Sequence, residues 1–138
     1  MKIVSRINVS AILVIAALIS ACQYFDSGIE WRAGRFALLW IDLPERVLLS
    51  YDQGDGGWDN LVNATVFAVG WDGRYLVAKQ HPNGDKQITN YFIVDSQHYA
   101  IKAKRESFVT GPLSETDFQK IAASMKLPPF TKVLDSLK

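Results

Sequence analysis

The first 22 residues constrain this chain most, because they divide a segment that is removed from a segment that folds. A short basic region ends at Arg6, residues 11–19 form an uninterrupted apolar run, and the small residues Ser20 and Ala21 follow. This order of basic, apolar and small residues is typical of an export signal. As a helix, the apolar run would span about 14 Å, against about 30 Å of bilayer hydrocarbon, which is too short for a transmembrane anchor. We therefore expect residues 1–21 to be a cleaved signal peptide.

Cys22 is the only cysteine of the chain and follows this segment directly. An ordinary secretory cut after Ala21 would place Ile19 where a small residue is favoured, and it would export one unpaired thiol. Ile19-Ser20-Ala21-Cys22 resembles instead the lipobox of bacterial lipoproteins. The resemblance implies cleavage between Ala21 and Cys22, a diacylglyceryl group on the thiol and an acyl group on the new amine. Because two or more acyl chains anchor a protein stably, we expect a lipid anchor in a membrane.

The residue after the cysteine is Gln23. In Gram-negative lipoproteins, which this segment resembles, aspartate at that position tends to retain the protein at the inner membrane. The resemblance therefore implies a place in the cell envelope on the periplasmic face of the outer membrane. A Gram-positive host would instead place the same anchor on the outer face of the cell membrane.

Removing 21 of the 138 residues leaves 117, the usual size of one domain. We expect residues 22–33 to form the lipidated cysteine and a tether, and residues 34–138 to form a single globular domain. Lys2 and Arg6 leave with the signal, so the 15 basic residues fall to 13, against 14 acidic ones. This balance argues against nucleic-acid binding and against adhesion through a polybasic patch. With the thiol acylated, disulfides and cysteine metal sites are ruled out, and we expect no cofactor.

Apolar and β-branched runs, separated by turn residues, predict strands along most of the domain. The clearest runs span residues 36–41, 46–51, 64–71, 75–80 and 89–95, with weaker runs at 98–103 and 106–110. Asp72-Gly73 lies between two of them and supplies the positive φ that a two-residue hairpin turn needs.

The periodicity changes after Gly111-Pro112. From Phe118 to Met125, apolar residues recur at spacings of three and four, which places them on one face of a helix, and Ser114 precedes them as a cap. Residues 131–137 are compatible with one or two further helical turns. We expect an α+β fold, in which an antiparallel, meander-like β-sheet of five to six strands is closed by one C-terminal amphipathic helix. A mainly-β barrel or sandwich is the alternative.

The loop richest in acid and glycine carries Asp52, Asp55 and Asp59. A calcium loop is the more specific interpretation, because three carboxylates lie within one turn-rich stretch. Their spacing does not match the alternating acids and the distal glutamate of an EF-hand, so we favour a flexible, solvated loop without a metal. Trp58 lies in the same loop and is expected to be exposed, and exposed tryptophans are frequent anchors of protein interfaces.

His81 and His98 are the only histidines, and each lies near the end of a predicted strand. A metal-binding pair is the functional interpretation, whereas two isolated histidines are more often solvated surface groups. No H-E-x-x-H or G-x-S-x-G pattern is present, so we assign no catalytic residue. The candidate binding residues are Trp58, Asp52, Asp55, Asp59 and His81.

Three motifs occur in a characteristic order along the domain. Residues 71–82 read WDGRYLVAKQHP, residues 91–95 read YFIVD, and residues 111–118 read GPLSETDF. They resemble the D-x-x-[YF]-I-[IV]-A-K-Q strand, the YYIID strand and the GPL-[ST]-x-x-x-F helix entry of a domain-of-unknown-function family of small bacterial lipoproteins, number 3997. The glycine-rich stretch at residues 52–59 is longer than that pattern leads us to expect. The resemblance implies a compact exported domain, and it brings no reaction and no catalytic residues.

These features favour a non-enzymatic, membrane-anchored lipoprotein that binds another envelope protein. The most concrete form is an immunity or inhibitor lipoprotein that sequesters a toxin or hydrolase. The second class is an enzyme or ligand-binding protein acting on cell-wall or sugar substrates, and the third is a structural lipoprotein without a discrete partner. A binding module should lose its activity on a Trp58→Ala change, whereas an enzyme should lose it when a single acid or histidine is replaced.

Overall fold

The computed structural model describes residues 26–100 and 103–138, so the expected signal peptide and Cys22 lie outside the described residues. The elements in chain order are β1 (Ser27–Ala33), β2 (Phe36–Ile41), β3 (Leu48–Asp52), β4 (Trp58–Val62), β5 (Val66–Trp71), β6 (Tyr75–Gln80), η1 (Pro82–Gly84), β7 (Asn90–Asp95), η2 (Arg105–Ser107), β8 (Val109–Leu113), α2 (Glu115–Met125) and β9 (Lys132–Val133). The strands form two antiparallel sheets with the orders β1-β2-β3-β4 and β8-β7-β6-β5-β9.

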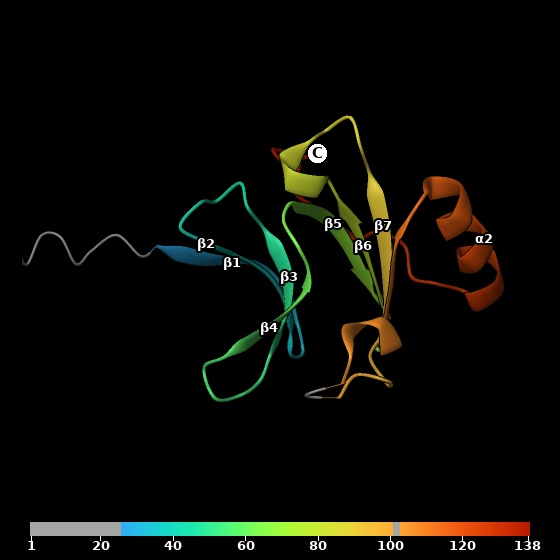
Figure 1. Cartoon of the computed structure of the whole chain (residues 1–138), viewed down its shortest axis with the longest axis horizontal. Helices are drawn as coiled ribbons and strands as arrows, with labels where there is room; N and C mark the ends of the chain where they lie inside the picture. The colour runs from blue at the N-terminus through green and yellow to red at the C-terminus, as the bar shows by residue number, and fades with distance from the viewer. Residues whose placement is uncertain (1–25, 101–102) are drawn as a thin grey trace, which may run out of the picture.

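The two sheets stand beside one another and α2 lies on the far side of the second, as Figure 1 shows. Phe36, Leu38 and Leu49 of the first sheet share one buried cluster with Val69 and Leu76 of the second. The largest buried cluster therefore lies between the sheets, where burial of apolar area drives their association.

A second, smaller cluster joins α2 to the other face of the second sheet. Phe118 of the helix is buried with Val77, Tyr91 and Ile93. The helix begins where the capping residue was expected, since the Ser114 hydroxyl accepts a hydrogen bond from the Asp117 amide at 3.1 Å. The result is three layers in the order sheet, sheet, helix.

Across the described residues the predicted α+β class is confirmed, with antiparallel strands, one α-helix and no closed barrel. The strands at residues 36–41 and 75–80 have the predicted bounds. The Asp72-Gly73 turn is also confirmed, because Gly73 has φ +97° and the Asp72 carboxylate accepts hydrogen bonds from the Arg74 and Tyr75 amides, at 2.8 and 2.7 Å. The expected single sheet of five to six strands is instead two sheets, of four and five strands. The strands β1, β4 and β9 were not predicted.

Three local expectations are wrong. Residues 27–33 were assigned to the tether, but they form β1, whose Trp31 pairs with Leu38 and packs against the main core. Residues 98–100 and 103 are turns or irregular structure rather than part of a strand. Residues 131–137 do not continue as helix, because the Leu134 amide donates to the Phe67 carbonyl and β9 pairs with β5. Within the described ranges, no helix is long and apolar enough to cross a membrane.

Candidate functional site

The layer order leaves one sheet face without a covering element among the described residues, namely the face of the first sheet that points away from the second (Figure 1). Phe36 and Leu38 point into the core, so the alternate residues of β2 and their cross-strand partners lie on the other face. We call this surface the open face and define it by Ile29, Arg32, Leu39, Ile41, Leu48, Asp52 and Trp58.

The open face exposes two branched apolar side chains, whereas Leu39 on the same face is only 5% exposed. Ile29 and Ile41 are 51% and 52% exposed, respectively. A shallow groove of about 420 Å³ lies here, with Ile29, Leu39, Ile41 and Trp58 among its lining residues. Exposed branched side chains beside a tryptophan are typical of a surface that another molecule covers.

Trp58 is held at the edge of this groove by a charged pair. The Arg32 guanidinium lies 5.1 Å from the centre of the Trp58 ring, and its Nη1 donates to Asp52 Oδ2 at 3.2 Å. The pKa of Asp52 is lowered most by a hydrogen bond from the Gly54 amide, and second most by the hydrogen bond from Arg32. The three side chains are thus arranged in advance, which reduces the entropy lost when a partner binds. The expectation that Trp58 sits at a binding surface remains a prediction, and Trp58 is half-buried rather than fully exposed.

Asp55, in the glycine-rich loop, and Asp59, on β4, do not join this group. Asp55 Oδ1 accepts from the Gly57 amide at 2.9 Å, while Asp59 accepts from Gln53 Nε2 at 2.7 Å and from the Tyr99 hydroxyl at 2.6 Å. Each of these two carboxylates therefore accepts its own hydrogen bonds, separate from those of Asp52. Over residues 26–100 and 103–138, no group of three or more histidine, cysteine, aspartate or glutamate side chains is arranged to hold a metal ion.

The Tyr99–Asp59 bond gives a prediction. The pKa of Tyr99 is raised most by burial, and second most by the hydrogen bond to Asp59. The unfolded tyrosine ionises near pH 10 while the folded one stays protonated, so this stabilisation is present below pH 10 and is lost as pH rises above it. We expect Tyr99→Phe to lower the free energy of unfolding by about 1–2 kcal/mol at neutral pH and to flatten its decline above about pH 10. Urea unfolding across pH would check this, and an unchanged alkaline decline in the variant would contradict the assignment.

His81 was expected to be a solvated surface group, and this is wrong. The residue is only 4% exposed, because its ring stacks on Phe67 with centroids 4.2 Å apart. Its Nδ1 donates to the Ile88 carbonyl at 2.8 Å, whereas Nε2 is buried without a hydrogen-bond partner among the described residues. His81 lies in the connection after β6 and Trp58 on the open face, so the fold does not bring these two candidate residues together.

A carboxylate–histidine pair escaped the sequence reasoning. Asp95 Oδ2 lies 2.8 Å from His98 Nδ1 and 3.5 Å from Arg74 Nη2. Burial raises the pKa of Asp95, but the hydrogen bonds from His98, Gln97 and Arg74 together outweigh it and lower the pKa. The i,i+3 spacing across the turn after β7 was the signal that could have revealed this pair.

The Asp95–His98 pair borders a cavity of about 490 Å³ between β7, β8 and α2. Two serines also line it, and both hydroxyls donate to backbone carbonyls: Ser107 to Lys104 at 2.6 Å and Ser124 to Ile121 at 2.9 Å. An oriented imidazole is therefore present, but neither lining hydroxyl points its proton at it. The arrangement does not form a serine nucleophile.

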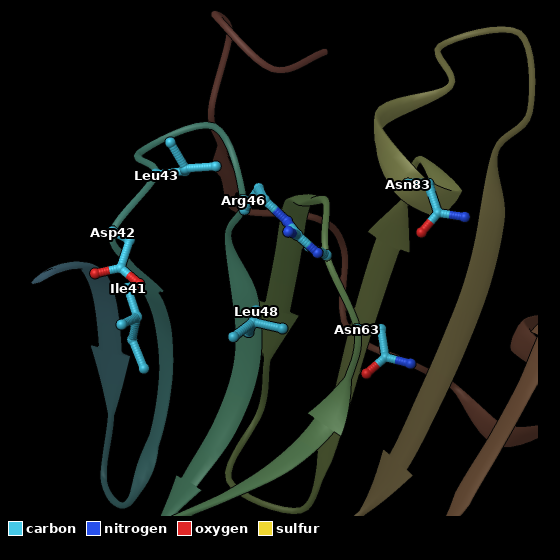
Figure 2. A pocket seen from close by; sticks show the side chains of 8 residues that line it. Ile41, Asp42, Leu43, Arg46, Leu48, Asn63 and Asn83 are labelled. Atoms are coloured by element: carbon cyan, nitrogen blue, oxygen red, sulfur yellow. The ribbon is translucent and has the colours of Figure 1, made fainter.

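A hollow of about 350 Å³ lies at one end of the open face (Figure 2). Leu43 and Arg46 lie on the β2–β3 loop above it, Ile41 and Leu48 line its strand side, and Asn63 and Asn83 lie across it. Sequence reasoning missed this group, because its members come from three connections that meet only in the folded chain. Asp42, with φ +67°, also lines the hollow, together with Ala64.

Arg46 gives this hollow its main recognition chemistry. Its guanidinium is exposed and has no ion-pair partner among the described side chains. A second hollow of about 420 Å³ shares Arg46, Ala64 and Asn83 with the first, and is bounded by Glu45 and Lys86. One free guanidinium beside amides and carboxylates suits a ligand that carries both signs of charge.

The sequence matches a family model described as protein of unknown function, DUF3997, over residues 34–135. This match spans more than half of the 138 residues. The chain belongs to the DUF3997 family. The resemblance noted in its three motifs is thereby confirmed. No curated protein and no solved structure matches the chain.

The family match includes only part of the open face of this DUF3997 chain. Asp52, Trp58 and the Arg46 hollow lie inside the matched residues, whereas β1, with Ile29 and Arg32, precedes them. The guanidinium that stacks on Trp58 thus comes from a strand outside the matched region. Because the family is described only as of unknown function, the function must be argued from these surfaces.

Proposed function

We propose that this DUF3997 chain is a lipid-anchored lipoprotein of the cell envelope that binds another envelope protein through its open face. The observation that carries the binding role is the uncovered apolar sheet face with Trp58 stacked against Arg32. The lipobox-like ending at Cys22 supports the anchor and the envelope location. Sequestration of a toxin or hydrolase, as by an immunity or inhibitor protein, is the form that we favour.

A protein partner suits the chemistry of this face. Tryptophan and arginine dominate the energetics of protein interfaces, particularly where apolar neighbours exclude water around them. Here Trp58 and Arg32 adjoin Ile29, so one partner covers all three. The groove between them is shallow and open, which fits a protruding side chain of a partner better than an enclosed small molecule.

The partner can be found by cross-linking in intact cells, followed by purification in detergent and mass spectrometry. One stoichiometric protein is the expected result. Recovery of no protein would contradict the proposal and favour a glycan or small-molecule ligand.

Trp58→Ala is expected to weaken binding of that partner about thirtyfold, which corresponds to about 2 kcal/mol, because it removes the central aromatic contact. Met125→Ala is the control, since Met125 is an apolar residue that is 38% exposed and lies on α2, on the far side of the molecule. Thermal unfolding of both variants would show that the fold is kept. Equal affinity of Trp58→Ala and the wild type would refute the open face as the binding surface.

An enzyme acting on cell-wall or sugar substrates is the second candidate, and the Asp95–His98 pair is the observation that favours it. His98→Ala separates the two candidates. A binding module should keep its partner affinity when His98 is replaced, whereas an enzyme that uses the imidazole should lose turnover.

A further inference from the structure

The end of the domain where β1 begins carries a distinctive combination of apolar and charged side chains. We propose that this end, formed by Asp26, Ile41, Asp42, Leu43 and Arg46, lies against the lipid bilayer and contacts its headgroups. The inference rests on the proposed lipid anchor at Cys22. It adds a fixed orientation, which the anchor alone does not supply.

Chain length is the first argument. Asp26 is four residues after Cys22, so their Cα atoms are at most about 14 Å apart. The Asp26 carbonyl accepts a hydrogen bond from the Asp42 amide at 2.8 Å, which fixes Asp26 beside the β2–β3 loop. A bilayer that holds the acyl chains of Cys22 therefore lies within reach of Ile41 and Leu43.

Apolar exposure is the second argument. Ile41 and Leu43 are 52% and 44% exposed, although both belong to residue types that are usually buried. Figure 2 shows Ile41 at the end of β2 and Leu43 on the loop that follows, with Asp42 between them and Arg46 on the same loop. Apolar side chains next to an arginine are typical of protein surfaces at the headgroup boundary, where the guanidinium reaches the phosphates.

The charges at this end indicate which lipid it suits. Arg46 and Lys86 are accompanied by Asp42 and Glu45, and all four line the same pair of hollows. This balance does not attract an anionic surface, but it matches a zwitterionic headgroup, whose phosphate can pair with Arg46 and whose amine can lie near the carboxylates. We therefore expect contact with phosphatidylethanolamine-type headgroups, with little dependence on salt.

Spin labelling of the full-length protein can test this orientation. A Leu43→Cys variant would be labelled with a nitroxide and reconstituted into vesicles of phosphatidylethanolamine and phosphatidylglycerol. Lys104→Cys is the matched control, because Lys104 is also exposed and precedes η2 at the opposite end of the molecule (Figure 1). Circular dichroism would verify that both variants are folded.

The label at Leu43 is expected to collide several-fold less often with a water-soluble nickel reagent than the label at Lys104, and more often with oxygen. Equal nickel accessibility at both positions, on protein that floats with the vesicles, would overturn the inference. The inference would also fail if the label at position 43 were shielded from the nickel reagent in intact cells but exposed to it in vesicles that hold no other protein. Another protein, rather than lipid, would then cover this end.

The same samples distinguish failure of the inference from failure of the anchor. Cys22 is the only native cysteine, so an acylated Cys22 leaves one label per chain. Two labels per chain would refute lipidation, and the inference would fall with it. One label per chain with a water-exposed Leu43 would refute the orientation alone.

Discussion

Replacing Cys22 by alanine is expected to abolish fatty-acid labelling and to move the protein from the membrane fraction to the soluble fraction. The reason is that the proposed acyl chains would supply the membrane affinity, at about 0.8 kcal/mol per buried CH₂, and alanine has no thiol to receive them. The expected change is close to all-or-none, because a few exposed apolar residues such as Ile41 and Leu43 cannot replace several acyl chains. Radiolabelled palmitate and fractionation of cells measure it directly.

A matched control keeps the cysteine and changes its neighbour. Ser20→Ala retains a small residue at that position, so we expect normal labelling and fractionation. A Cys22→Ala protein that stays labelled and membrane-bound would refute the lipid anchor. An unlabelled protein that stays membrane-bound would instead assign the membrane affinity to uncleaved residues 1–21 or to the domain itself, and the mass of the protein would distinguish the two.

Gly70→Ala in β5 is expected to destabilise the domain by about 3 kcal/mol or more, with a Tm lower by roughly 10–20 °C. A Cβ at this position would overlap the Pro129 carbonyl oxygen and lie 2.8 Å from its carbon. The C-terminal segment crosses β5 here, held by a hydrogen bond from the Thr131 amide to the Val69 carbonyl at 3.0 Å. Either this segment must leave the sheet or the strand must shift. Urea unfolding measures the loss.

Gly34→Ala is the control for backbone effects. Gly34 has φ +57° and no atom within 4 Å of the added methyl group, so the change costs only the left-handed strain, about 1 kcal/mol. If both variants lost the same stability, then close packing of Pro129 over β5 would not be the cause.

The sequence predicted best those elements whose signal is local. β2 is a continuous apolar run between polar residues, and β6 follows an Asp-Gly turn, so hydrophobicity and turn chemistry set their bounds. The helix followed from its spacing and its cap, Ser114. These signals depend on neighbours in the chain, and neighbours are visible in a sequence.

The missed strands depend on distant partners. β1 carries Glu30 and Arg32, and β4 carries Asp59 and Asn60, so neither shows the clean alternation of a half-buried strand. Their places are set by pairing with β2 and β3. β9 is two residues long and exists only because β5 offers it an edge.

The same distinction between local signals and distant contacts applies to the candidate site. Trp58 was predicted to be a binding residue because an aromatic beside a glycine-rich stretch is conspicuous, and its binding role stays a prediction. The Arg46 hollow was not, because it forms where three connections meet. The burial of His81 was missed since Phe67, which covers its ring, lies fourteen residues earlier, on β5.

The order of strands in each sheet has a kinetic consequence. β1 to β4 are neighbours in chain order, and so are β5 to β8, which leaves β9 as the one strand that pairs with a partner far back in the sequence. Pairings between consecutive strands close short loops and form early, whereas distant pairings form late. Under the proposed export, with the N-terminus emerging first, the first sheet would form before the second has emerged, and the docking of residues 131–134 onto β5 would be the last step of folding.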